Sequence, residues 1–224
     1  MDLGLTGLRV LVTAASRGLG AATARRFSLE GAQVAIASRD RARVEAAAAR
    51  IGAESLGKVL PLVADISDGA AASALVRQAG DALGGLDILV TNAGGPPAGS
   101  FDSLTLEAWQ EATQLTLLSA VSLVNAALPY LRQSDHPAIL TITSYSAKQP
   151  IPNLALSNSL RGAVIGLTKT LANELGPEGI RVNSIMPGWT RTERVDELMT
   201  GRAARNNTTV EAEIAAQTAQ IPLR

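Results

Sequence analysis

Short, nearly continuous apolar runs alternate along the chain with longer segments that are rich in alanine. Runs such as LRVLVTA and AQVAIAS lack the apolar–polar alternation of a half-exposed strand, so they predict strands buried on both faces. The alanine-rich segments predict helices, several of which end at a glycine. The predicted strands cover residues 8–14, 32–38, 58–65, 86–94, 137–144 and 180–188. The predicted helices cover residues 20–31, 41–52, 67–85, 105–131 and 157–176.

This repeated strand–helix order predicts the fold class. It favours an α/β protein with a doubly wound parallel sheet, Rossmann-like, in a single domain over residues 1–224. Pro61 falls inside a predicted strand and indicates an edge or an irregular position, because proline cannot donate to a neighbouring strand. Ser67 is the candidate N-cap of the following helix, and the long helix is expected to kink before Pro129. Residues 200–224 are polar at first and then weakly helical.

Composition and charge exclude several classes of function. Twenty basic and twenty acidic residues cancel, which argues against nucleic-acid or membrane binding driven by charge. The absence of cysteine excludes thiolate chemistry, and with one histidine a zinc site is not expected. That histidine, His136, lies in the polar run RQSDHP and is expected in an exposed loop. The N-terminus lacks the features of a signal peptide or spanning helix, so we expect a soluble, cytoplasmic protein without a metal.

The segment TAASRGLG, residues 13–20, lies between the first predicted strand and the first predicted helix. A dinucleotide-binding fold holds its pyrophosphate at this point, on backbone N–H groups at a helix N-terminus. Glycines here would let the backbone approach the phosphates and the helix pack closely. A structural turn is the competing interpretation, and the strand–loop–helix context favours nucleotide binding. The candidate contacts are Thr13, Ser16, Arg17, Gly18, Leu19 and Gly20.

The stretch ASRD at the end of the second predicted strand bears on the choice of cofactor. A carboxylate at this position would accept a hydrogen bond from the ribose 2′-OH and repel a 2′-phosphate. Ser38 stands there instead, Arg39 follows it, and Arg17 lies in the phosphate loop. Two guanidinium groups favour a phosphate, which predicts NADP(H) rather than NAD(H). The competing interpretation makes Arg39 a solvated residue at a helix start and Asp40 an N-cap.

Further motifs follow in order along nearly the whole chain. They are ADIS at residues 64–67, TNAGG at residues 91–95 and RVNSIMPGWTRT at residues 181–192. With the phosphate loop, they resemble the short-chain dehydrogenase/reductase family, in particular the branch similar to β-ketoacyl-acyl-carrier-protein reductases. The resemblance implies additional cofactor contacts at Asp65, Ile66, Asn92, Ala93, Gly94, Pro187, Gly188, Thr190 and Thr192.

The resemblance also implies hydride transfer between a nicotinamide and a carbonyl or alcohol, with four supporting residues. A serine orients the carbonyl and falls on Ser144. An asparagine that supports a proton-relay water is replaced by Thr116. The proton-donating tyrosine is replaced by Ser157, and the lysine that lowers its pKa and holds the ribose is replaced by Arg161. A further departure is Ala14, which stands where the phosphate loop of the family begins with glycine.

These replacements predict altered chemistry. A serine hydroxyl is a poor general acid at neutral pH, and general acid catalysis typically contributes about 10²–10⁴-fold. Arg161 keeps the positive charge but cannot release a proton. Tyr145, with Lys148 nearby, is a candidate substitute donor; the alternative is a core or partly exposed tyrosine and a surface lysine. A serine hydrolase is not favoured, because His136 has no evident place beside Ser144 or Ser157.

Two functions therefore remain open on the sequence. One is an NADP(H)-dependent oxidoreductase acting on a small-molecule carbonyl or alcohol through a non-standard site. The other is a nucleotide-binding sensor or supporting subunit without redox turnover.

The resemblance also implies a homo-oligomer, a dimer or tetramer, and a further helix and strand that are missing after Arg224. An apolar stripe on the helix over residues 157–176 would serve either the core or a two-fold helix pair; its members are Leu160, Val164, Leu167, Leu171 and Leu175.

Overall fold

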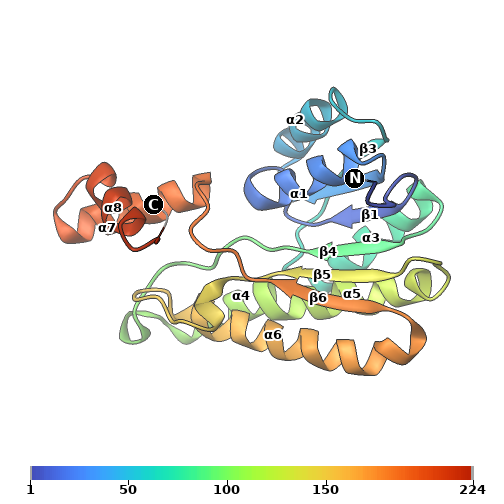
Figure 1. Ribbon diagram of the computed structural model, residues 1–224. Helices are drawn as coiled ribbons and strands as arrows, with labels where there is room; N and C mark the ends of the chain where they lie inside the picture. Colours follow the sequence, from blue (N-terminus) through green and yellow to red (C-terminus); the bar gives the residue numbers. More distant parts are fainter. Residues whose placement is uncertain (1, 223–224) are drawn as a thin grey trace. The chain divides into compact units, whose positions relative to one another are not determined.

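The computed structural model describes residues 2–222. Within them a six-stranded parallel sheet has the order β3-β2-β1-β4-β5-β6 (Figure 1), so the predicted α/β fold is confirmed. Strands β2 and β3 lie on one side of β1, and the strands that follow along the chain, β4, β5 and β6, lie on the other side. Such a reversal opens a crevice at the carboxyl ends of the strands, where α/β proteins bind ligands. The strands are β1 Arg9–Val12, β2 Gln33–Ser38, β3 Val59–Val63, β4 Ile88–Thr91, β5 Ala138–Ile142 and β6 Arg181–Ile185.

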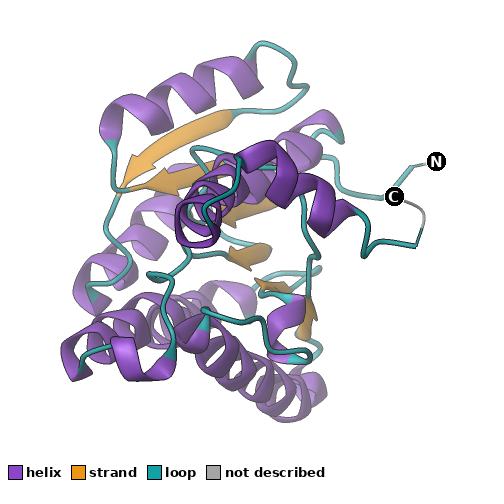
Figure 2. Cartoon of the chain, turned by 90° about the vertical axis from the view of Figure 1, so that its left-hand side faces the viewer, coloured by secondary structure: helices purple, strands orange, loops and turns teal. Residues whose placement is uncertain are grey.

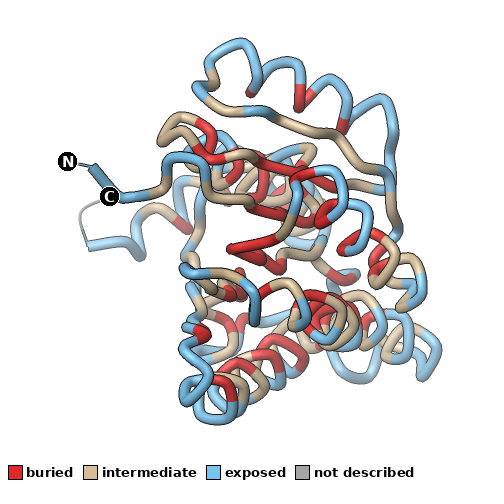
Figure 3. Tube along the Cα trace, turned by 90° about the vertical axis from the view of Figure 1, so that its right-hand side faces the viewer, coloured by how far each residue is buried: buried red, intermediate tan, exposed pale blue. Residues whose placement is uncertain are grey.

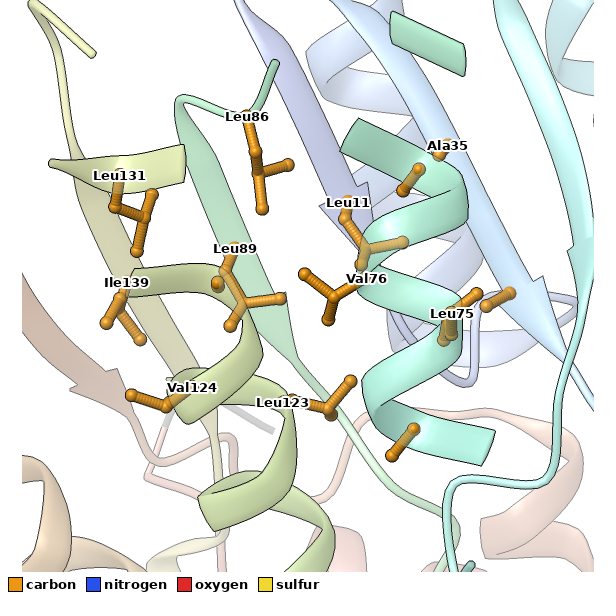
Figure 4. Close-up of a cluster of buried hydrophobic side chains, with 14 of the residues drawn as sticks. Leu11, Ala35, Leu75, Val76, Leu86, Leu89, Leu123, Val124, Leu131 and Ile139 are labelled. Carbon is orange, nitrogen blue, oxygen red and sulfur yellow. The ribbon is translucent and has the colours of Figure 1, made fainter. Parts of the chain in front are cut away.

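Helices cover both faces of the sheet (Figure 2), and two apolar clusters fill the space between the layers. Side chains alternate across each strand: Leu11 enters the cluster under α3 and α5, whereas Val10 and Val12 enter the cluster under α1 and α2. Figure 4 shows the first cluster, and the buried residues coloured in Figure 3 include most of the central strands β1, β2, β4 and β5. The helices are α1 Gly18–Leu29, α2 Arg41–Gly52, α3 Gly69–Leu83, α4 Leu106–Thr113, α5 Ser119–Leu131 and α6 Ala155–Leu175.

Two local expectations agree with the structure. Pro61 lies in β3, at the edge of the sheet, where it pairs only with β2. The apolar stripe of α6 serves the core: Leu160, Val164 and Leu175 are buried, and Leu171 packs against the first cluster. Leu167 is half-buried, and a two-fold helix pair formed by the stripe stays a prediction.

Another local expectation was wrong. Asp68, and not Ser67, is the N-cap of α3, because its carboxylate accepts hydrogen bonds from the backbone N–H groups of Ala70 and Ala71 at 2.7 and 3.2 Å. The long helix continues through Pro129, which lies inside α5, and the expected kink there stays a prediction. Its irregularity is a single π-helical turn, Gln114–Leu118, between α4 and α5. Such turns occur frequently at functional sites.

The chain divides into two compact units, residues 1–187 and 188–224. The second unit contains α7 Glu193–Asn206 and α8 Val210–Thr218, so the expectation of a merely weakly helical tail was incomplete. Buried Glu213 of α8 accepts hydrogen bonds from Asn206 at 2.8 Å and Thr208 at 2.6 Å. An acidic first turn after Thr192 was the available signal for α7. The single domain over residues 1–224 stays a prediction.

One helical stretch among the described residues, Leu106–Leu131, is long and apolar enough to cross a membrane by length and composition alone. This signal is weak, because the core helix of a soluble protein gives it as well. Leu123, Val124 and Leu131 from this stretch belong to the first apolar cluster. Packing against the sheet thus accounts for part of the apolar character of the stretch.

Asp87 joins three segments at the amino end of the sheet. Its carboxylate accepts hydrogen bonds from the Arg9 side chain at 2.9 and 2.7 Å, from the Arg9 backbone N–H at 2.8 Å and from Ser134 at 2.5 Å. Burial raises the pKa of this carboxyl, but the hydrogen bonds from Arg9 and Ser134 outweigh burial and lower the pKa to about 2. The ionised carboxylate therefore stabilises the fold.

We expect Asp87→Asn to destabilise the protein more at pH 5.5 than at pH 2.5. The folded pKa lies below the ordinary value of 3.8, so the stabilisation is present above pH 3.8 and is lost as the pH falls toward 2. The difference corresponds to about 2 kcal/mol in the free energy of unfolding, measured by urea denaturation at both pH values. The control Glu178→Gln removes an exposed partner of Arg132 and should show a smaller change. An equal loss at both pH values for Asp87→Asn would contradict the prediction.

Candidate active site

The loops after β1 and β4 are tied together by two polar side chains. Thr13 Oγ1 donates to the Asn92 carbonyl oxygen at 2.7 Å and accepts from the Asn92 backbone N–H at 2.9 Å. Asn92 Nδ2 donates to the Ala14 carbonyl oxygen at 3.1 Å. Both residues come from the predicted cofactor motifs, and the structure brings those motifs side by side at the carboxyl end of the sheet.

Helix α1 packs directly against this junction. A Cβ atom at Gly20 would lie 2.5 Å from the Ala14 carbonyl oxygen and 2.8 Å from Asn92 Nδ2. Any larger residue would therefore push the helix away from the loop. Gly18 at the start of the helix has a φ of 57°, a conformation that glycine adopts at little cost. As predicted, Gly20 allows the helix to pack closely, and Gly18 supplies the backbone conformation that the turn requires.

The N-terminus of α1 lacks a side-chain cap. Arg17 occupies the N-cap position and, having only donors, makes no capping hydrogen bond. By contrast, Asp40 and Asp68 cap their helices with carboxylate oxygens. An α-helix leaves its first N–H groups without partners inside the helix, and these groups attract anions. The donors at this helix end are chemically suited to a phosphate group.

The predicted specificity residues lie at the ends of β2 and β3. Arg39 is exposed, and Asp40 accepts a hydrogen bond from the Arg43 backbone N–H at 3.0 Å, so its predicted capping role is correct. Hydrogen bonds from Ser67 lower the pKa of the Asp65 carboxyl, and the positive charge of Arg39 lowers it further. Arg39 and Asp65 therefore lie within electrostatic reach of each other, with buried Ile66 beside them.

Four predicted residues from three regions of the chain line one pocket. They are Asn92 and Ala93 after β4, Thr116 in the π-helical turn and Arg161 in α6. Thr116 is buried, and its hydroxyl has no hydrogen-bond partner among the residues that the structure describes. Arg161 is buried too, and its Nη1 donates to the Ile142 carbonyl oxygen at 3.0 Å. This last contact was missed, because a backbone acceptor leaves no signature in the residue type.

Ser144, Tyr145 and Ser157 lie in neighbouring segments. Ser144 has extended backbone, and its Oγ accepts from the Ser146 backbone N–H at 3.1 Å, which caps the 3₁₀ turn Tyr145–Ala147. Strand β5 ends at Ile142, so the expected strand alternation does not fix where half-buried Tyr145 points. Ser157 lies half-buried in the first turn of α6, one turn before Arg161.

The two remaining polar candidates, His136 and Lys148, are both exposed. His136 is exposed and precedes β5, whereas Ser144 follows that strand. The two residues therefore stand at opposite ends of β5, and no serine–histidine pair forms there. Lys148 is exposed after the 3₁₀ turn. Among the described residues no group of three or more histidine, cysteine, aspartate or glutamate side chains has a metal-binding arrangement.

The remaining predicted cofactor contacts fall on both units. Gly94 lies in the loop after β4, Ser16 and Leu19 lie at the start of α1, and Pro187 ends the first unit. The Pro187 carbonyl oxygen accepts from the Tyr145 backbone N–H at 3.3 Å. Gly188, Thr190 and Thr192 belong to the second unit, where the guanidinium of Arg202 lies 5.7 Å from the centre of the Trp189 ring.

Comparison with known proteins assigns this arrangement to a family. The profile of the short chain dehydrogenase family matches residues 9–203. The chain belongs to the short-chain dehydrogenase family. The ketoacyl reductase assigned to the monensin polyketide synthase of Streptomyces virginiae is 35% identical over 218 residues, which cover 95% of this chain and 82% of that protein. Human dehydrogenase/reductase SDR family member 4 is 35% identical over 183 residues, which cover 81% of this chain and 66% of that protein.

Solved structures of this family have the same fold. A short chain dehydrogenase from Burkholderia cenocepacia in complex with NADP is 38% identical, with a TM-score of 0.80 over 85% of this chain and 77% of that one. L-sorbose reductase from Gluconobacter frateurii, complexed with NADPH and L-sorbose, is 30% identical, with a TM-score of 0.88 over 95% of this chain and 81% of that one. Both likenesses cover most of this short-chain dehydrogenase.

We expect Ala14→Gly to raise the free energy of unfolding by about 1 kcal/mol. Ala14 has a φ of 47°, and the left-handed region disfavours residues that carry a Cβ atom by roughly that amount. Urea denaturation measures the effect. The matched control is Ala46→Gly in the exposed middle of α2, which should lower the free energy of unfolding by about 1 kcal/mol. A loss of stability in Ala14→Gly would contradict the interpretation.

Proposed function

We propose that this short-chain dehydrogenase is an NADP(H)-dependent oxidoreductase that interconverts a small-molecule carbonyl and alcohol. The observation that carries the proposal is the junction at α1. There Gly20 packs against Ala14 and Asn92 and leaves uncapped N–H groups facing the crevice end of the sheet. The ketoacyl reductase relative supports carbonyl reduction, in the manner of a β-ketoacyl substrate. The NADP and NADPH complexes of related structures support the choice of cofactor.

The proposed cofactor contacts follow the crevice. The first N–H groups of α1, with Thr13, Ser16 and Leu19, would hold the pyrophosphate. Arg17 and Arg39 would hold the 2′-phosphate, because guanidinium groups bind phosphate through paired hydrogen bonds. When bound, NADPH supplies the hydride for the reaction. The proposed contacts to the adenine and nicotinamide ends are Asp65, Ile66, Asn92, Ala93, Gly94, Pro187, Gly188, Thr190 and Thr192.

The proposed catalytic residues work without the usual tyrosine and lysine of this family. Ser144 orients the carbonyl through its hydroxyl. Arg161, whose Nη1 donates to the Ile142 carbonyl oxygen, keeps a fixed positive charge at the site and is the proposed contact to the ribose. Ser157 offers a hydroxyl that is too weak an acid to give up a proton readily at neutral pH. Tyr145 is our candidate for a phenolic proton donor, since a phenol is in general a stronger acid than an aliphatic alcohol.

With these residues, we expect proton transfer to be the slow step that limits the rate. Measurable turnover by the parent protein therefore distinguishes the proposed oxidoreductase from a nucleotide sensor or supporting subunit. A homo-oligomeric state and a cytoplasmic location also stay predictions. None of the proposed contacts depends on either of them.

We expect the double variant Ser157→Tyr, Arg161→Lys to reduce ketones or β-ketoacyl thioesters faster than the parent. Restoring a phenol beside an amine should recover part of the 10²–10⁴-fold that general acid catalysis contributes, so about 10²-fold in kcat is the expected gain. NADPH consumption with a substrate panel, followed at 340 nm, measures the rate.

Ser144→Ala is the control for this experiment. Introduced into the double variant, it should abolish the gain, because the restored tyrosine still needs an oriented carbonyl. A parent without turnover and a double variant without gain would together contradict the oxidoreductase. A parent that turns over as fast as the double variant would contradict the proposal that Ser157 and Arg161 make proton donation slow.

We expect Arg39→Ala to raise the Kd for NADPH about tenfold and to leave the Kd for NADH nearly unchanged. The reason is the loss of a charged hydrogen bond to the 2′-phosphate, which NADH lacks. Isothermal titration calorimetry measures both constants. Arg41→Ala is the matched control, because Arg41 is exposed one turn away and pairs with Glu45. Tighter binding of NADH than of NADPH by the parent would refute the preference.

A further inference from the structure

Two large apolar side chains at the start of α4 lie on the surface of the protein. Phe101 is 77% exposed and Leu106 is 68% exposed. Among the described residues, only Leu56 is a more exposed large apolar side chain than Phe101. Because water disfavours apolar surface, two such side chains so close in the sequence indicate a surface that another molecule covers.

The fold does not use these two side chains. The inner face of α4 packs against α6 through Ala108 and Trp109, which contact a small apolar cluster. That cluster consists of Ala112, Leu156 and Leu160. In the part of the chain that the structure describes, neither exposed side chain belongs to this cluster or to the two larger ones. The outer apolar surface is therefore available to a second molecule while α4 stays packed.

The segment that carries Phe101 is held in place. The Gly99 backbone N–H donates to the Asn153 carbonyl oxygen at 2.7 Å, and the Ala155 N–H donates to the Gly99 carbonyl oxygen at 3.2 Å. These bonds join the segment to the start of α6. The Phe101 ring meets the Trp109 ring edge to face, with the ring centres 6.3 Å apart. A surface that is already ordered loses little conformational freedom when a partner binds.

The sequence around this surface carries only negative charge. Asp102 follows Phe101, Glu107 follows Leu106, and Glu111 lies one helical turn after Glu107; all three carboxylates are exposed. None of them forms an ion pair with another described residue.

The chain contributes no basic residue to balance them from the same stretch. No lysine, arginine or histidine occurs between Arg77 and Arg132. The three carboxylates therefore attract a positively charged partner and repel a nucleic acid or an anionic lipid surface. A second copy in a two-fold contact would bring the same three carboxylates against each other. A partner with apolar side chains flanked by basic ones matches both properties of the surface.

We propose that the surface formed by Phe101, Asp102, Leu106, Glu107 and Glu111 binds a basic amphipathic helix of another protein. Such a helix presents apolar side chains three or four positions apart and carries lysine or arginine beside them. Its apolar side chains contact Phe101 and Leu106, and its basic side chains pair with the carboxylates. The surface contains none of the residues proposed for the cofactor or the reaction, so binding is independent of the proposed oxidoreductase function.

The first test uses the full chain and a helical peptide built only of leucine and lysine as the probe. Isothermal titration calorimetry should show saturable binding, and a peptide with glutamate in place of lysine should not bind. In Trp189→Phe, Trp109 is the only tryptophan left, because the chain has two. Its fluorescence should change on binding, since Trp109 contacts the Phe101 ring. Equal binding of the glutamate peptide, or unchanged fluorescence at saturation, would overturn the proposal.

The second test separates the two properties of the surface. Glu107→Lys should raise the Kd for the lysine peptide about tenfold, because repulsion replaces attraction. Leu106→Ser should raise it about tenfold as well, by loss of an apolar contact. The matched controls are Glu174→Lys, near the far end of α6, and Leu56→Ser, after α2; both residues are exposed. These controls should bind like the parent, and equal effects in the two pairs would overturn the proposal.

Sedimentation velocity tests whether a second copy covers the same surface instead. We expect the parent and Leu106→Ser to have the same mass in solution. A smaller assembly for Leu106→Ser than for the parent would identify a contact between copies of the chain and would overturn the proposal.

Discussion

The structure depends on how closely helix α1 approaches the ends of β1 and β4. Thr13 and Asn92 bond to each other and to the adjacent backbone, so the two loops form one rigid junction. Only a glycine at position 20 lets the helix reach that junction, because a Cβ atom would overlap the Ala14 carbonyl. This close approach aims the helix N-terminus at the crevice of the sheet. Ala14 itself takes up a left-handed conformation to complete the turn.

The proposed site has two halves that depend on different interactions. In the half proposed to face the phosphates, the N-terminus of α1 has no side-chain cap. In the half proposed to move protons, the family resemblance places Ser157 and Arg161 in the register of the tyrosine and lysine. Hydrogen bonding of backbone groups maintains the first half, which tolerates few changes. Side-chain chemistry maintains the second half, and a change there alters the reaction without disturbing the fold.

The sequence by itself determined the order of strands and helices, the edge position of Pro61 and the segments that form the phosphate loop. Those features follow from local patterns of apolar residues, glycine and proline, which act over a few neighbouring positions. It did not determine the π-helical turn around Thr116 or the bond from Arg161 to the Ile142 carbonyl. The tertiary structure decided these, because the partners in that bond lie 19 residues apart and meet only when α6 packs beside the end of β5. That the Thr116 hydroxyl has no hydrogen-bond partner among the described residues is likewise a result of tertiary packing and not of the residue type.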